Sequence, residues 1–370
     1  MTSSSAPKSL LAFPCMKTPL AAWHKAQGAG LINDRGIELP ERFTDPLQEY
    51  QAVREKAGLI DLSFRVQVRM TGEDRVSFLQ GMVSNDVKAL QPGDGCAATL
   101  LTEQGRIVAD LRVYALDTCF LLDVDARVKE KMIEALSRFI VADDVEMEDL
   151  SEQQVTLALQ GPVASQVLAA AGIPIALTKG FQHGEATLAG TSVRIIRVSD
   201  TGEDGYEILA PSAQAELIWQ TLLQAGGQLG LCPVGLTALN TLRVEAGIPW
   251  YGLDMDEGRI VLEVGLEHAF SFSKGCYLGQ EVIERATARG HVNRKLMGLL
   301  VQGETLPASG DKLFQDAQEA GWVTSAVVSP RLGRPIALGY VRREYQAPGT
   351  QLRIDRQGTP VLAEVTTLPF

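Results

Sequence analysis

The 370-residue sequence predicts an α+β protein, with two α+β domains built on antiparallel sheets and a C-terminal β-barrel. Residues 63–150 give the order strand, helix, three strands, helix, and residues 151–260 again mix short strands with helices. After residue 290 helical periodicity disappears, and β-rich runs are separated by Gly and Pro. We therefore expect a discontinuous domain (18–62 and 151–260), an inserted domain (63–150), a connecting segment (261–290) and a barrel domain (291–370).

The N-terminal residues up to about Ser9 are rich in Ser, Ala, Pro and Lys, so we expect them to be disordered and order to begin near Thr18. The apolar run 10–13 is interrupted by Pro14 and Lys17 before it reaches the length of a signal peptide. Because no window approaches 18 uninterrupted apolar residues, we expect no membrane span.

Helical and alternating patterns place the elements of the first half. A helix is predicted at 49–59, a strand at 66–70 and a helix starting at 72–74. Strands follow within 97–116, broken by a turn at 103–106, and at 120–124. A helix at 126–139 is expected to bury four residues: Val128, Met132, Leu136 and Phe139.

The second half continues with a strand at 155–159, a helix at 163–171 and a strand at 193–198. A helix at 213–226 is expected to bury Leu217, Leu222 and Leu223, with Trp219 on its flank. Another helix, 236–246, ends at Gly247, the residue type expected after a helix C-terminus. The predicted barrel strands are 296–301, 321–328, 336–341, 351–353 and 361–365.

Charge and cysteine usage restrict the class of protein. A net charge of −11 argues against a protein that coats nucleic acid. Arg285, Arg289, Arg294 and Lys295 form either a local basic patch or a solvated face. An odd number of cysteines without a C-x-x-C pair (Cys15, Cys96, Cys119, Cys232, Cys276) indicates a reducing compartment, and we expect a cytoplasmic protein. The four histidines lack metal-ligand spacing, so no metal site is predicted.

The segment 274–281, Lys-Gly-Cys-Tyr-Leu-Gly-Gln-Glu, carries the densest chemistry in the chain. It places a cation, a thiol, a phenol, an amide and a carboxylate around Gly275 and Gly279, whose backbone freedom allows a close approach to a ligand or partner. The alternative is a glycine-punctuated turn followed by a solvated helix.

This octapeptide resembles the signature of the YgfZ family, folate-binding proteins that support the assembly or maintenance of iron–sulfur clusters. That family is a branch of the superfamily of the glycine-cleavage T-protein, a tetrahydrofolate-dependent aminomethyltransferase that usually lacks the cysteine at this place. Further similar stretches lie at 58–63, 202–207, 242–257 and 321–341. The resemblance implies a T-protein-like fold around a central folate cavity, with tetrahydrofolate or a one-carbon derivative as the cofactor.

The resemblance also implies site residues. Glu207 is the expected reader of the pterin, because one carboxylate can accept hydrogen bonds from the ring amide and the amino group together. The remaining residues assigned to folate binding are Asn85, Arg243, Tyr206, Lys274 and Tyr277. Arg243 and Glu245 are alternatively an exposed pair at a helix end. Cys276, beside Lys274 and Arg285, is either a reactive thiol that acts as a transient ligand or nucleophile, or a packing residue.

Three departures from the T-protein pattern bear on catalysis. T-proteins carry two adjacent acidic residues where this chain has Ala109 and Asp110, a tyrosine where it has Asp200, and an arginine where it has Leu239. Because successive strand residues face opposite sides, Asp110 need not point where the lost carboxylate did.

Two functions follow from the resemblance. The first is a tetrahydrofolate-binding, YgfZ-like protein that supports iron–sulfur enzymes together with client or assembly proteins, and that need not turn over a substrate. The alternative is a folate-dependent aminomethyl- or methyltransferase in which Asp110 positions the folate amine, Cys276 is the other catalytic candidate, and a lipoyl-carrier protein docks.

Overall fold

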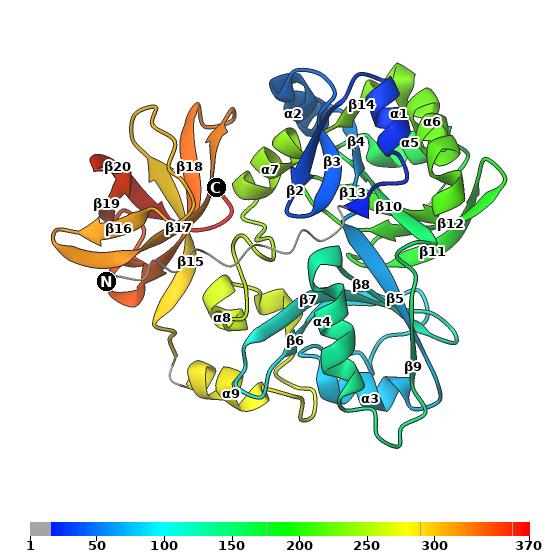
Figure 1. The fold of residues 1–370 in the computed structure, drawn as a ribbon, viewed down its shortest axis with the longest axis horizontal. Helices are drawn as coiled ribbons and strands as arrows, with labels where there is room; N and C mark the ends of the chain where they lie inside the picture. The colour runs from blue at the N-terminus through cyan, green and yellow to red at the C-terminus, as the bar shows by residue number, and fades with distance from the viewer. Residues whose placement is uncertain (1–15, 175, 289, 357) are drawn as a thin grey trace, which may run out of the picture.

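The computed structural model describes residues 16–174, 176–288, 290–356 and 358–370. Four sheets organise the described part of the chain (Figure 1): a six-stranded and a three-stranded sheet in the upper α+β unit, a five-stranded sheet in the lower α+β unit, and a closed barrel at the side. The predicted α+β class with a C-terminal barrel is therefore confirmed. The predicted disorder before Ser9 falls outside the described residues.

The six-stranded sheet has the order β11-β12-β13-β10-β4-β14 and is antiparallel except for the parallel pair β14–β4. It draws strands from both sides of residues 63–150. Its strands are β4 (Ala57–Asp61), β10 (Gln154–Gln160), β11 (His183–Leu188), β12 (Thr191–Arg197), β13 (Gly205–Pro211) and β14 (Leu231–Val234). The associated helices are α1 (Ala21–Ala26), α2 (Pro46–Glu55), α5 (Ala164–Ala170), α6 (Ala215–Gly226) and α7 (Leu236–Glu245).

A small sheet of order β1-β3-β2 is formed by residues that come before α2 in the chain. It consists of β1 (Met16–Lys17), β2 (Gly30–Asp34) and β3 (Ile37–Arg42), none of which was predicted. Helix α2 starts where Asp45 accepts a hydrogen bond from the Leu47 amide, with Pro46 in the first turn. The predicted helix 49–59 is too long, because β4 already begins at Ala57.

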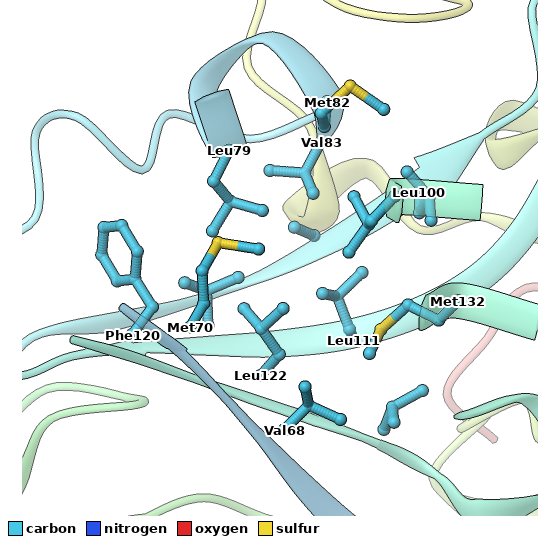
Figure 2. Packing of buried hydrophobic residues seen from close by; sticks show 14 of the residues in the cluster. Val68, Met70, Leu79, Met82, Val83, Leu100, Leu111, Phe120, Leu122 and Met132 are labelled. Atoms are coloured by element: carbon cyan, nitrogen blue, oxygen red, sulfur yellow. The ribbon is translucent and has the colours of Figure 1, made fainter. Parts of the chain in front are cut away.

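The five-stranded sheet is antiparallel throughout, with the order β6-β7-β8-β5-β9. Its strands are β5 (Arg65–Thr71), β6 (Gly95–Leu101), β7 (Ile107–Ala115), β8 (Phe120–Asp125) and β9 (Glu146–Asp149), and its helices are α3 (Arg75–Met82) and α4 (Ala126–Ser137). Figure 2 shows the core of this unit, in which Leu79 and Met82 of α3 and Met132 of α4 pack with side chains from the strands.

The connecting segment holds the short helices α8 (Val261–Val264) and α9 (Gln280–Ala288). The barrel that follows closes in the order β15-β18-β17-β16-β19-β20, because β15 pairs with both β18 and β20. Its strands are β15 (Arg294–Val301), β16 (Lys312–Gln315), β17 (Gln318–Ser329), β18 (Arg334–Arg342), β19 (Gln351–Arg356) and β20 (Thr359–Thr366). Strand β16 was missed by the sequence analysis. The limits of the discontinuous, inserted, connecting and barrel segments given above remain a proposal.

Two predicted core residues are wrong. Phe139 lies beyond the end of α4 and is 41% exposed, and Leu217 is 44% exposed, whereas Trp219 is fully buried. Residues two apart on a helix face nearly opposite directions, so α6 cannot bury both Leu217 and Trp219. Burying the larger indole removes more apolar surface from water.

The described basic residues near residue 290 each have an acidic partner. Arg285 Nη2 lies 3.8 Å from Glu281 Oε2. Arg294 Nε lies 3.4 Å from Glu263 Oε1, and Lys295 Nζ lies 2.8 Å from Glu267 Oε1. Arg289 and Cys15 fall outside the described residues, and the other four cysteines are free thiols. No described helix has the length and apolar character needed to cross a membrane.

Candidate functional site

A cavity lies where the five-stranded sheet, the six-stranded sheet and the chain after α7 meet. The space inside it that water-sized molecules can occupy is about 80 Å³. Charged residues from both units and three aromatic rings surround it. The lining residues are Leu62, Phe64, Arg65, Asp110, Arg112, Asp125, Asp200, Leu239, Ile248, Pro249, Trp250 and Tyr251.

Asp110 reaches this cavity from β7. The residue is partly buried, and among the described residues its covered Oδ1 atom has no hydrogen-bond partner. Burial raises the pKa of Asp110, while the positive charges of Arg65 and Arg112 oppose that shift. An unsatisfied buried acceptor is costly, so this oxygen is suited to an N–H or O–H donor of a ligand.

Arg112 follows Asp110 by two residues on β7, so the two side chains leave the same face of the strand. Its Nη1 donates to Glu207 Oε1 at 2.5 Å, and its Nη2 donates to Asp200 Oδ1 at 2.6 Å. The two carboxylates raise the pKa of Arg112 and keep it charged. The guanidinium therefore joins β7 to the loop before β13 and to β13 itself.

Glu207 lies on β13, is fully buried, and is not among the residues that line the cavity. Its Oε2 atom has no hydrogen-bond partner in the described part of the chain. Burial raises the pKa of Glu207 to about 8, although Arg112 favours the ionised carboxylate. Because Arg112 both contacts Glu207 and lines the cavity, a ligand in the cavity meets the guanidinium, whereas the sequence analysis expected direct contact with Glu207.

Tyr206 lies in the opposite direction from Glu207, as expected for neighbouring strand residues. It is buried in the core formed by the six-stranded sheet with α5 and α6. The structure does not bring Tyr206 into the cavity.

The segment 274–281 fastens the connecting segment to the five-stranded unit. Lys274 is 7% exposed, and its Nζ donates to the carbonyls of Gln80 (2.7 Å), Val83 (2.6 Å) and Asn85 (2.8 Å) at the end of α3. Its ammonium also lies 5.0 Å from the ring centre of the buried Tyr277. These contacts satisfy carbonyl groups that a helix C-terminus leaves free.

Asn85 and Cys276 differ in their surroundings. Asn85 Nδ2 donates to the carbonyls of Ala97 (2.7 Å) and His268 (3.2 Å), and thus ties two backbone segments together. Cys276 is exposed. The cations expected beside this thiol are engaged elsewhere, Lys274 with the end of α3 and Arg285 with Glu281. None of the predicted residues of this segment lines the cavity with Asp110.

Arg243, a residue of α7, is fully buried, and its side chain contacts the barrel. It donates to Asp254 Oδ2 at 2.5 Å and to Ser325 Oγ at 2.8 Å, and its guanidinium lies 4.6 Å from the ring centre of Trp250. The alternative of an exposed Arg243–Glu245 pair is wrong, because both residues are buried and have separate partners. Arg243 therefore supports Trp250, which forms part of the cavity wall.

Arg112 was not among the site residues predicted from the sequence, and Asp200 was given no positive role. A signal was present, because Asp110 and Arg112 are two residues apart on one predicted strand and must share a face. The sequence did not indicate that Glu207 is the partner of Arg112, because Glu207 is 95 residues away in sequence and lies on the other sheet.

Comparisons with known proteins cover nearly the whole chain. Residues 20–274 match the family profile of the GCVT N-terminal domain, and residues 294–370 match that of the glycine cleavage T-protein C-terminal barrel domain. Proteins named aminomethyltransferase are similar in sequence. The one from Pelodictyon phaeoclathratiforme is 34% identical over 359 residues, covering 96% of this chain and 98% of the relative. The one from Thermosynechococcus vestitus is 36% identical over 355 residues, covering 96% and 95%.

The same similarity is seen among solved structures. The crystal structure of the glycine cleavage system aminomethyltransferase T from Bartonella henselae superposes with a TM-score of 0.88 at 28% sequence identity. The match covers 96% of this chain and 98% of that chain, so it includes both α+β units and the barrel.

Proposed function

This chain belongs to the glycine-cleavage T-protein family, and we propose that it binds tetrahydrofolate in the cavity and acts as a tetrahydrofolate-dependent aminomethyltransferase. One observation carries the proposal: Asp110 lines the cavity, and its covered Oδ1 atom has no hydrogen-bond partner among the described residues. The resemblance to T-proteins supports this proposal, because it leads us to expect the acid that serves the folate amine on this strand. The aminomethyltransferase relatives favour this function over the iron–sulfur role that the octapeptide first suggested.

The cavity residues fit a flat, amine-bearing ligand. Phe64 and Trp250 give apolar walls, and Asp110 gives an acceptor for an amine N–H. The raised pKa of Asp110 brings this carboxyl closer to the range in which it can exchange a proton with an amine near neutral pH. Tetrahydrofolate would supply the amines that take up the one-carbon unit, while Asp110 Oδ1 would hold and orient the proton on such an amine.

The test is a transfer assay with an aminomethylated lipoyl-carrier protein and tetrahydrofolate, read as formation of methylenetetrahydrofolate. We expect turnover by the unmodified protein. Asp110→Asn should lower kcat by about 100-fold or more, because a group that orients or exchanges a proton contributes an effect of that size. Asp143→Asn, at an exposed aspartate, is the matched control and should keep full activity.

Calorimetry with tetrahydrofolate separates binding from turnover. Binding without turnover would reject the transferase and retain a folate-binding protein. Absence of both would reject the proposal entirely.

A second candidate function rests on the exposed Cys276. The Lys-Gly-Cys-Tyr segment resembles YgfZ, and an exposed thiol can reach a partner protein or a cluster. On this proposal Cys276→Ala should lower the activity of iron–sulfur enzymes in cells and leave tetrahydrofolate affinity unchanged, whereas Cys232→Ala should have no effect. Unimpaired iron–sulfur enzymes in the Cys276→Ala strain would reject this role.

A further inference from the structure

We propose that Arg112 is the specificity-determining residue of the cavity, that it reads the ring carbonyl of the pterin, and that Glu207 acts behind it as a positioning residue. The inference rests on the proposed function. It differs from the sequence-based expectation in how the ligand is recognised. The pterin would meet the hydrogen-bond donor Arg112 first, whereas the sequence predicted that it meets the acceptor Glu207.

The placement of the two side chains supports this order. Arg112 lines the cavity and Glu207 does not, although the atoms that join them are only 2.5 Å apart. The Arg112 side chain is 16% exposed and the Glu207 side chain is 0% exposed. A ligand in the cavity as it stands can therefore contact the guanidinium, and would have to displace it to reach Glu207.

The Arg112 guanidinium is held in one orientation and still has N–H donors without a partner among the described residues. Arginine has five N–H donors, and among the described residues Arg112 makes two hydrogen bonds, one to Glu207 and one to Asp200. Two acceptors hold its plane in one orientation, so the remaining N–H groups are available at little further cost in side-chain entropy. Asp200 is itself oriented, since its amide donates to Gln160 Oε1 at 2.9 Å.

The neighbouring charges define what the arginine can recognise. Asp110 and Asp200 are acceptors that line the same cavity as the donor Arg112. A lactam edge complements such a site, because its carbonyl accepts from a guanidinium while the adjacent ring N–H and the amino group donate to carboxylates. A 4-amino pterin puts a donor where the carbonyl was, so two donors would face each other and the guanidinium would lose its acceptor.

Calorimetry with two ligands tests the inference: tetrahydrofolate, which has the 4-oxo group, and tetrahydroaminopterin, which has a 4-amino group. The unmodified protein should prefer the 4-oxo ligand by about 10- to 100-fold, the ratio expected from one hydrogen bond to a charged group. Arg112→Met should abolish the preference. Arg69→Met, which changes an exposed arginine on β5, is the matched control and should retain it.

Glu207→Gln distinguishes the positioning role from direct reading. The amide oxygen can still accept from Arg112, so this variant should keep the preference for the 4-oxo ligand and lose less than about tenfold in affinity. If Glu207 read the pterin directly, Glu207→Gln would lose the preference and Arg112→Met would keep it, and that result would overturn the inference.

A second variant covers the case in which Arg112→Met does not fold. Arg112→Lys keeps a positive charge between the two carboxylates but lacks the planar fork, so the preference should fall without loss of the fold. An unchanged preference in Arg112→Lys and in any folded Arg112→Met would reject the role of Arg112. If the unmodified protein binds neither ligand, both the inference and the folate function fail; if it binds both equally, only the inference fails.

Discussion

Lys274 offers a direct test of whether the 274–281 segment binds a ligand or holds the structure together. We consider Lys274→Met, which keeps the length of the side chain and removes its charge and donors. The ammonium donates to three carbonyls, those of Gln80, Val83 and Asn85, at 2.6–2.8 Å. At about 1 kcal/mol net for each bond, the loss approaches about 3 kcal/mol, and it is offset in part because a buried ammonium no longer has to be desolvated.

We therefore expect Lys274→Met to lower the free energy of unfolding by about 1–3 kcal/mol, measured by urea denaturation followed by circular dichroism. The effect should appear in the cooperative unit that contains α3. Lys312→Met, at an exposed lysine paired with Glu319, is the control and should change stability by less than about 0.5 kcal/mol.

The affinity for tetrahydrofolate distinguishes a structural role of Lys274 from a role in ligand binding. Because Lys274 does not line the cavity, folded Lys274→Met should bind as tightly as the unmodified protein. Unchanged stability together with a large loss of affinity would refute this reasoning and make Lys274 a ligand-binding residue, as the sequence analysis proposed.

Three further predictions concern stability. Burial lowers the pKa of His183 to about 4; because the unfolded chain then takes up the proton first, stability should fall as the pH falls from about 6.5 to 4, and His183→Gln should flatten this dependence in urea titrations. Gly161→Ala should cost about 3 kcal/mol or more, since a Cβ would lie 2.5 Å from the Lys56 carbonyl oxygen, whereas Gly172→Ala, with a positive φ but open space, should cost about 1–2 kcal/mol; equal losses would contradict the clash. Arg243→Met should destabilise by about 3–5 kcal/mol by leaving buried Asp254 without its cation, and a neutral effect in thermal unfolding would show that the pair is dispensable.

Most of the architecture could be predicted because it depends on local periodicity. In strands that bury one face, apolar and polar residues alternate, and in helices apolar residues recur every three to four positions. The barrel is indicated by the loss of the helical pattern. Strands β2 and β11, with five and six residues, were also missed. The other missed strands are short or interrupted: β1 has two residues, β9, β14 and β16 have four each, and β3 contains Pro40. Patterns of that length carry too few positions to distinguish a strand from a loop.

The site was harder to predict because its contacts join distant segments. Arg112 meets Glu207 across 95 residues, and Lys274 meets Gln80 across 194 residues. Sequence patterns indicated which residue types matter, but local periodicity does not say which charged side chains meet. Glu207 was therefore named as a candidate site residue, whereas its direct neighbour Arg112 was not. Lys274 was expected at a ligand, and its ammonium instead satisfies backbone carbonyls.

The departures from the T-protein pattern are coupled in space. The family resemblance expects an arginine at the position of Leu239, and Leu239 lines the cavity in this chain. A guanidinium is nevertheless present there, because Arg112 enters the same cavity from β7 and is held by Asp200, the residue that stands where the family has a tyrosine. An unpaired Asp200 would add an uncompensated negative charge to a cavity that already contains Asp110. Arg112 offsets that charge and also donates to Glu207, while Asp110 Oδ1 has no hydrogen-bond partner among the described residues. If the proposed function and the proposed role of Arg112 hold, these substitutions change the group that recognises the ring and leave in place the carboxylate that would meet the amine.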